Sequence, residues 1–449
     1  MTDCTQLKIC FHPRFPIDVS FDAPDTSSDG GALLLRQVDD RLKLSQQFAA
    51  CIPDHRNPVF VVHTRLEQIR QRIFQIALGY EDCNDAKTLR LDPLLKVACD
   101  LLPEDEGQLS SQPTLSRLEN AADMRSIKKL LLLREGNYVA SFKSPPELVI
   151  LDIDTTDDPT HGQQELSFFH GYYDQHMYHP MLVFDGLTGQ LVTAILRPGN
   201  AHAARGGMGV LRRIIVALRR RFPKTSIVVR GDSAFAVPRL TAMLEELNVE
   251  LGGVDFLLGL AQNANLHRLG APVMAAANAK FAAGENYVRH FDSFRYAAKT
   301  WPHERQVVMK AERTEKGENP RFIVTSIEGF PPQWMYDAYC ERGQCENLIK
   351  DFKNAIQSDR LSCETFVANF FRLLEHAAAY DLMHALRVHA GEASPALATV
   401  QMDTLRLRLL KVAATVKQSA RRISVRLPRA FPLAGIFAAI SGALAALNL

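Results

Sequence analysis

The order of apolar runs between residues 146 and 263 limits the fold more than any other feature of the chain. The run ELVILDIDTT alternates, so that Asp152 and Asp154 share one face of a strand and apolar residues share the other. LSFFHGYYD follows, and MLVFDGLTGQLVTAIL then carries D-G and T-G turn signals between two apolar runs, which predicts a hairpin. Three antiparallel strands in succession are therefore expected.

The pattern then changes to alternating helices and strands. It reads as a helix in GGMGVLRRIIVALRRRF, a strand in SIVVRGD, a helix in PRLTAMLEELN and a strand in VDFLLGLA. Three antiparallel strands followed by alternating helix and strand form the ribonuclease-H-like arrangement of an α/β fold.

Carboxylates stand where two of these strands end. Asp154 closes the first strand and Asp232 follows the fourth, and in such a fold these two strands are neighbours. Asp152 shares the face of Asp154 and stays open as the alternative first carboxylate. Asp157 and Asp158 are expected in a solvated loop, since short acidic clusters after a strand are common in turns.

A charged stripe follows much later, in the segment YCERGQCENLIKDFK. At about 100° per residue, five side chains fall within an arc of about 80° on a helix: Tyr339, Arg342, Glu346, Lys350 and Lys353. The opposite side carries Leu348, Ile349, Phe352 and Ile356. A solvated helix supported by pairs four residues apart is the simple interpretation. Gly343 in its interior would cost about 1 kcal/mol against alanine.

Together, Asp154, Asp232 and Glu346 suit a divalent metal site. Clustered carboxylates repel one another and take up protons unless a cation lies between them. Their hard oxygens favour Mg²⁺, with Mn²⁺ as the other option. Two ions held in this way can activate an attacking oxygen and stabilise a leaving oxygen in phosphoryl displacement. The expected cofactor is therefore Mg²⁺, as two ions.

The stripe and the segments GYEDCNDAKTLRLDP and LSSQPTLSRLEN resemble a known family. They are similar to bacterial insertion-sequence transposases of the DDE class with a Y-R-E-K signature, in the insertion-sequence family numbered thirteen-eighty, from about Asp29 to about Arg387. The resemblance favours Asp154 over Asp152 as the first carboxylate. It implies that Glu346 binds metal, that Tyr339, Arg342 and Lys353 contact the terminal phosphates of the element, with Lys350 on the same face, and that a homodimer forms on DNA.

Six regions are predicted along the chain. An irregular segment (1–30) precedes a helical, DNA-binding domain (31–140), the first part of the catalytic domain (146–263), a β-rich insertion (264–330), the return of the catalytic domain with the Glu346 helix (331–390) and a C-terminal helical region (391–449).

Two helices in the second region suggest a helix-turn-helix. LDPLLKVACDLL and PTLSRLENAADMRSIKKLLLL are joined by a polar connector, and Arg117 lies near the exposed start of the second helix, where a major-groove reader would stand. The connector is longer than the usual tight turn, and a proline in a first turn is also an ordinary helix start. Both interpretations remain open.

Composition adds few limits. Lys+Arg 52 against Asp+Glu 50 gives a net charge of +2, so any DNA contact must be local. Eight scattered cysteines show no zinc-like spacing and are expected to be reduced thiols: Cys4, Cys10, Cys51, Cys83, Cys99, Cys340, Cys345 and Cys363. No secretory signal is recognised, and a packed helix is favoured over a membrane anchor for Phe431–Leu449. A cytoplasmic, nucleoid-associated protein without a membrane partner is expected.

The function implied is transposition. Such an enzyme binds the terminal inverted repeats of its element in double-stranded DNA, cleaves phosphodiester bonds and joins the freed 3′-hydroxyl ends to target DNA. Two alternatives stay open: a ribonuclease-H-like nuclease or resolvase without strand transfer, and a non-catalytic DNA-binding repressor derived from a transposase.

Overall fold

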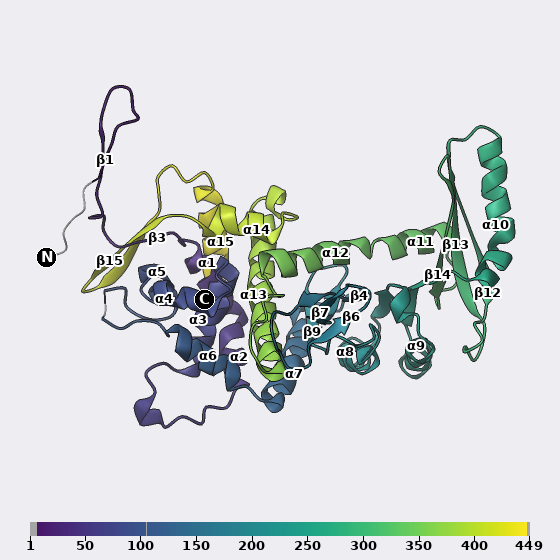
Figure 1. The fold of residues 1–449 in the computed structure, drawn as a ribbon, viewed down its shortest axis with the longest axis horizontal. Helices are drawn as coiled ribbons and strands as arrows, with labels where there is room; N and C mark the ends of the chain where they lie inside the picture. Colours follow the sequence, from purple (N-terminus) through teal and green to yellow (C-terminus); the bar gives the residue numbers. More distant parts are fainter. Residues whose placement is uncertain (1–6, 105, 447–449) are drawn as a thin grey trace. The chain divides into compact units, whose positions relative to one another are not determined.

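The structure is a computed structural model that describes residues 7–104 and 106–446 (Figure 1). The chain forms two compact units. The first contains the described residues up to Ala121, the short segment Ala355–Gln357 and the chain from Ala378 onward. The second contains Ala122–Asn354 and Ser358–Ala377. Among the described residues, no helix is long and apolar enough to cross a membrane.

The first unit is mainly helical. Its N-terminal elements are α1 (Ala32–Leu42), α2 (Leu44–Ala50), η1 (Pro58–Phe60), α3 (Arg65–Leu78), η2 (Cys83–Asp85), α4 (Ala86–Leu89), α5 (Pro93–Ala98) and α6 (Gln112–Asn120). Its C-terminal elements are the last part of α13 (Phe366–Ala393), η5 (Pro395–Leu397), α14 (Met402–Leu405), the π-helix η6 (Arg406–Leu410) and α15 (Ala434–Ala446). In α15, Ile440 and Leu444 are buried, so the described part of the apolar C-terminal run is a packed helix; residues 447–449 and Cys4 lie outside the described residues.

Both ends of the chain also contribute strands to this unit. β1 (Leu7–Ile9) pairs with β2 (Ile17–Val19), and β3 (Thr26–Ser27) joins β15 (Ala414–Ser419) and β16 (Arg422–Arg426) in an antiparallel sheet. The expected strand near Leu7 is confirmed. The predicted C-terminal helical region (391–449) contains helices, but it also contains the hairpin of β15 and β16, whose edge pairs with β3 from the N-terminal segment.

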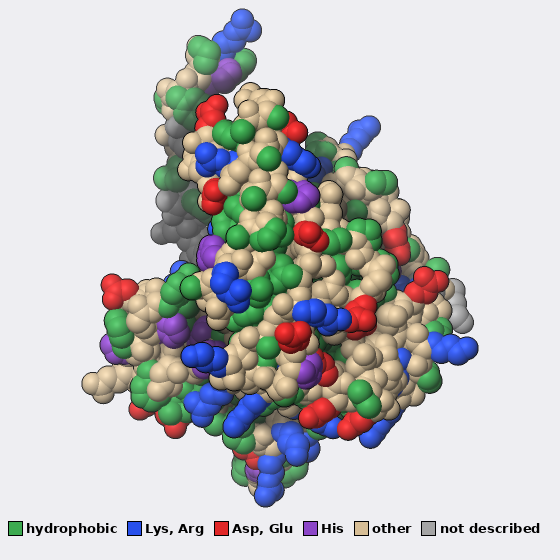
Figure 2. All heavy atoms as spheres, turned by 90° about the vertical axis from the view of Figure 1, so that its right-hand side faces the viewer, with side chains coloured by type: hydrophobic (Ala, Val, Ile, Leu, Met, Phe, Trp, Pro, Cys, Tyr) green, Lys and Arg blue, Asp and Glu red, His purple; other side chains and the backbone are tan. Residues whose placement is uncertain are grey.

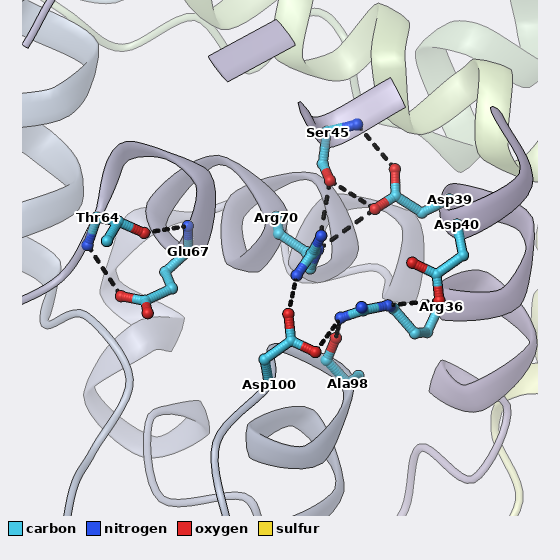
Figure 3. A network of polar contacts seen from close by, with 9 residues as sticks. All are labelled: Arg36, Asp39, Asp40, Ser45, Thr64, Glu67, Arg70, Ala98 and Asp100. Carbon is cyan, nitrogen blue, oxygen red and sulfur yellow. Dashed lines mark hydrogen bonds and ion pairs between the residues drawn. The ribbon is translucent and has the colours of Figure 1, made fainter. Parts of the chain in front are cut away.

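A polar network with a buried centre at Asp39, Ser45 and Arg70 and an exposed end at Asp100 joins helices of this unit (Figure 3). Arg70 on α3 donates from Nε to Asp39 and to the Ser45 hydroxyl, and its Nη1 pairs with Asp100. Arg36 on α1 donates to the other oxygen of Asp100 at 2.7 Å. Because buried charges must be paired and hydrogen-bonded, this network fixes α1, α2, α3 and the end of α5 against one another.

The second unit is built on an eight-stranded mixed sheet in the order β12-β13-β14-β11-β10-β4-β8-β9. The strands are β4 (Leu148–Thr155), β8 (Met181–Asp185), β9 (Leu191–Ile195), β10 (Ser226–Gly231), β11 (Val254–Leu260), β12 (Tyr287–Tyr296), β13 (Arg305–Thr314) and β14 (Gly317–Thr325). β4, β10 and β11 are parallel, whereas β8 is antiparallel to β4 and β9 is antiparallel to β8. The predicted order, three antiparallel strands and then alternating helix and strand, is confirmed.

LSFFHGYYD lies outside this sheet. It supplies β6 (Phe168–His170), which forms a small sheet with β5 (Asp158–Pro159) and β7 (Gln175–Tyr178).

Helices cover both faces of the large sheet. α7 (Met124–Ser141), α8 (Gly207–Arg221), α9 (Pro238–Leu251) and α10 (Ala264–Ala282) share one apolar cluster with the sheet. On β11, Phe256 and Leu258 face that cluster, while Leu257 faces a second cluster with Met335 on α11 (Pro332–Cys340). The alternation of side chains along a strand explains this division.

One boundary differs from that predicted. The run PTLSRLENAADMRSIKKLLLL is two helices, because Asp123 caps a new one, α7, which packs on the sheet of the second unit. The N-terminal part of the helical unit therefore ends at Ala121 rather than at residue 140.

The region 264–330, predicted as a β-rich insertion in the catalytic domain, opens with α10. Its three strands extend the main sheet through β14 and β11.

Candidate active site

Two parallel strands bring the first two carboxylates to one edge of the sheet. β4 and β10 pair in register from Ser226 with Leu148 to Gly231 with Ile153, so Asp154 and Asp232 follow at the same edge. Asp232 also accepts a hydrogen bond from the backbone N–H of Ala234 at 2.9 Å, which caps the short helix η3 (Ser233–Phe235). The sequence prediction of this pair is confirmed in its placement.

The third predicted carboxylate, Glu346, lies on the second part of an interrupted helix. α11 and α12 (Gly343–Lys350) follow each other end to end (Figure 1), with Glu341 and Arg342 in a turn between them. A π-helix, η4 (Asp351–Ala355), continues the chain. The stripe is therefore not one regular helix, and Gly343 stands at the first position of α12 rather than in a helix interior.

Arg342 lies near two of the predicted carboxylates, Asp154 and Glu346. Its Nη1 is 2.8 Å from Asp154 Oδ2, and its Nη2 is 3.7 Å from Glu346 Oε1. Arg342 and Asp154 are mostly shielded from solvent, whereas the Glu346 side chain is 59% exposed and lies at the rim. The guanidinium thus supplies positive charge where carboxylates converge.

Burial raises the pKa of Asp154 to about 6. The carboxylates of Asp232 and Glu346 act in the same direction, while the Arg342 guanidinium opposes them. Both of the other predicted carboxylates therefore act electrostatically on Asp154. A buried carboxyl with a raised pKa in an acidic cluster is the environment that a bound cation stabilises.

The donor set fits a divalent cation in its chemistry, because hard carboxylate oxygens are what Mg²⁺ and Mn²⁺ prefer. Across residues 7–104 and 106–446, however, no group of three or more His, Cys, Asp or Glu side chains is close enough to form a ready ligand set. In the structure Asp154 pairs with Arg342.

Asp152 has a different environment from Asp154. It is fully buried and forms a bidentate pair with Arg230 on β10, with Nε to Oδ1 at 2.7 Å and Nη2 to Oδ2 at 2.8 Å. Arg230 Nη1 also donates to the backbone oxygen of Ala338 in α11 at 2.7 Å. Both oxygens of Asp152 are engaged in holding α11 on the sheet, which leaves Asp154 as the carboxylate directed to the site.

Tyr339 lies beside the end of β10 in a closely packed position. A Cβ added at Gly259 would come within 2.7 Å of the Tyr339 hydroxyl and 2.9 Å of the Ser233 nitrogen. Only glycine leaves room for this approach. Burial raises the pKa of Tyr339, so its hydroxyl remains a neutral hydrogen-bonding group.

The other residues predicted to bind DNA are distributed differently. Lys350 is exposed at the end of α12, and Arg117 is exposed on α6 in the first unit. Lys353, in the π-helix, is 2.8 Å from Asp157 Oδ1. The prediction of a solvated loop at Asp157 and Asp158 is wrong for Asp158. This residue is buried, and it lies in β5, which pairs with β7.

Charges of both signs are mixed over much of the surface. Figure 2 shows acidic and basic side chains interspersed on one face, with lysine and arginine gathered toward its lower part. This agrees with a net charge of +2 and limits strong positive potential to local areas.

Sequence reasoning missed Arg230 and Gly259. A signal for Arg230 was present, because SIVVRGD and ILDID each carry a charged residue two positions before the candidate carboxylate, and the charges are opposite. In a parallel pair these positions are neighbours. No comparable signal marks Gly259, whose role depends on a side chain 80 residues later meeting the strand.

Comparison with known proteins identifies the family. The family model described as "Transposase DDE domain group 1" matches residues 11–449. No curated protein matches the chain. Among solved structures, the cryo-EM structure of a piggyBac transposase synaptic complex with hairpin DNA is similar at 10% sequence identity and a TM-score of 0.44, covering 84% of this chain and 79% of that chain. Because the family model matches nearly the whole chain, this chain belongs to the transposase DDE domain group 1 family.

Proposed function

We propose that the chain is an insertion-sequence transposase of the Y-R-E-K type, with a ribonuclease-H-like catalytic core. Two observations support this proposal: Asp154 and Asp232 follow neighbouring parallel strands, and Arg342 pairs with Asp154 and lies 3.7 Å from Glu346. Membership of a DDE transposase family supports it. The enzyme would bind the inverted-repeat ends of its element, cleave there and join the 3′-hydroxyl ends to target DNA.

The three carboxylates would hold Mg²⁺ or Mn²⁺, which would neutralise the reacting phosphate and activate the attacking oxygen. The chain's own residues have further parts in this proposal. Arg342, which pairs with Asp154 in the structure, would contact a DNA phosphate beside the scissile bond. Tyr339 would orient the same phosphate through its neutral hydroxyl. Positioning and charge neutralisation provide most of the catalysis in phosphoryl transfer.

Binding of double-stranded DNA would involve both units. Lys350 would contact the backbone near the site, and Arg117 would contact DNA from the helical unit. Joining two ends favours a homodimer in the DNA complex, acting in the bacterial cytoplasm. The roles of Lys350 and Arg117 are proposed because both residues are basic and exposed.

A strand-transfer assay tests the proposal. Duplexes that carry the DNA flanking the gene, supplied uncut or with the 3′-hydroxyl already exposed, are incubated with a target plasmid and Mg²⁺. Cleavage and joining are expected with the native chain and should be lost in Asp232→Asn and Glu346→Gln. Glu341→Gln, an exposed carboxylate in the adjoining turn, is the matched control and should retain activity.

The alternatives give different products. Cleavage without joining of pre-cut ends would indicate a nuclease or resolvase. Specific binding without cleavage would indicate a repressor. Full activity of either carboxylate variant would show that the site has been assigned to the wrong residues.

A further inference from the structure

Lys353 is held by the acidic segment that follows β4. Its Nζ donates to the backbone oxygen of Asp157 at 2.9 Å and to Asp157 Oδ1 at 2.8 Å, and Asp359 Oδ2 lies 3.9 Å away. The lysine side chain is only 18% exposed. Two of its three ammonium protons are therefore directed into the protein.

The partner of Lys353 is itself fixed. The second oxygen of Asp157 accepts a hydrogen bond from Gln175 Nε2 on β7 at 3.2 Å. The Lys353 ammonium and this amide outweigh burial, so the pKa of Asp157 is lowered and the carboxylate stays charged. A charged, doubly held carboxylate is a firm anchor for the lysine.

The contact links two segments that carry catalytic side chains. Asp157 comes three residues after Asp154, and Lys353 comes seven residues after Glu346. The π-helix changes the direction of Lys353 relative to a regular helix, so the spacing that placed it on the charged face of the stripe no longer applies. Lys353 thus connects the end of β4 to the chain after α12.

A DNA phosphate would find little free positive charge at this lysine. The charged Asp157 carboxylate pairs with its ammonium, and Asp359 Oδ2 lies 3.9 Å away. The neighbouring Asp158 is 1% exposed, and burial raises its pKa well above the usual value, which favours the neutral carboxyl. By contrast, Lys350 is exposed at the end of α12 and has no ion pair with any described residue.

We infer that Lys353 is a positioning residue, which holds the Asp154 strand end against the Glu346 helix, and that the phosphate contact from this part of the stripe belongs to Lys350. The inference rests on the proposed function, since it divides roles within that site. It reverses the role that the resemblance implies for Lys353.

Matched lysine variants test the assignment in the full-length protein. Lys353→Met and Lys350→Met are compared in binding to a duplex carrying the terminal inverted repeat over a range of salt concentrations, and in single-turnover cleavage at saturating protein. Lys350→Met should weaken binding to the duplex and lower the slope of log affinity against log salt by about one. Lys353→Met should leave the slope unchanged and lower the saturated rate by about 100-fold, as expected for a misplaced reacting group.

A double-mutant cycle identifies the partner. Asp157→Asn should reproduce the rate defect, and Lys353→Met with Asp157→Asn should be no worse than either single variant, because both remove one contact. Lys353→Arg should recover part of the rate by keeping a cation at Asp157. A lower salt slope in Lys353→Met, or rate defects that multiply in the double variant, would overturn the inference.

Hydrogen exchange separates this inference from the proposed function. Lys353→Met should speed amide exchange in residues 150–158 and 343–355, whereas Lys350→Met should not. If the native chain fails to cleave, the proposed function is wrong, yet faster exchange would still support the link between the two segments. Unchanged exchange in Lys353→Met would refute the link whatever the enzyme activity.

Discussion

Replacing Asp152 and Asp154 one at a time by asparagine should give opposite results. The two residues are close in sequence and share a strand face, but Asp152 holds Arg230 whereas Asp154 faces the site. Asp152→Asn should destabilise the fold and leave some cleavage at low temperature. Asp154→Asn should abolish cleavage without destabilising the fold.

The magnitudes follow from burial. Asp152 is fully buried and Arg230 is 2% exposed, so loss of one partner leaves an uncompensated charge in the interior. Such a loss costs about 3–5 kcal/mol in the free energy of unfolding. Asp154 is the reverse case, because its pKa rises from 3.8 to about 6. At about 1.4 kcal/mol per pKa unit, ionised Asp154 lowers the free energy of unfolding by about 3 kcal/mol above pH 6. Asparagine carries no charge and avoids this loss.

Denaturant unfolding of the full chain at pH 8 with a chelator measures both effects. The slope of free energy against denaturant must stay unchanged for the comparison to hold. Asp152→Leu combined with Arg230→Met is the control, and it should recover much of the stability lost in Asp152→Asn because the pair is replaced as a unit. Equal stability of Asp152→Asn and the native chain, or a loss of several kcal/mol in Asp154→Asn, would refute the reasoning.

Three further outcomes are expected. The pKa of Asp154 in the folded protein lies above its usual value, so the free energy of unfolding should fall as pH rises from about 4 to about 6. Urea unfolding across that range checks this, and Asp154→Asn should show no such fall. Gly259→Ala should cost about 1–3 kcal/mol through crowding at the Tyr339 hydroxyl, and Tyr339→Phe should recover part of that loss; unchanged thermal unfolding of Gly259→Ala would contradict it. Mg²⁺ should raise the melting temperature of the native chain by mass action but not that of Asp232→Asn, and equal shifts in both would place the ion elsewhere.

Local patterns in the sequence were enough to predict the catalytic strands. Alternation in ELVILDIDTT and the apolar run before Asp232 determine two strands, and a parallel sheet then requires their ends to meet. The charged stripe likewise indicated that Arg342 and Glu346 lie on one side of a helix, and they do face each other across 3.7 Å. These predictions succeeded because they depend on periodicity and on one rule of strand order.

Other features depend on contacts between distant segments. The region 264–330 is rich in strands, as predicted, but residues 264–282 form α10, which packs on the sheet, where Met309 lies against Gly270. The strand β15 pairs with β16 in a local hairpin and with β3 from the N-terminal segment. The local pattern contains neither the sheet surface under α10 nor the partner strand β3.

The sequence by itself identified the candidate residues: three carboxylates, and a stripe of tyrosine, arginine and lysine at helical spacing. The tertiary structure decided which partner each of them has. Asp152 and Asp154 differ in role because Arg230 lies beside one and Arg342 beside the other. Lys350 and Lys353 differ because a π-helix turns one toward Asp157 and leaves the other exposed. The physical reason is that a charged side chain takes its role from its partner and its burial, and both are set by contacts between residues far apart in the chain.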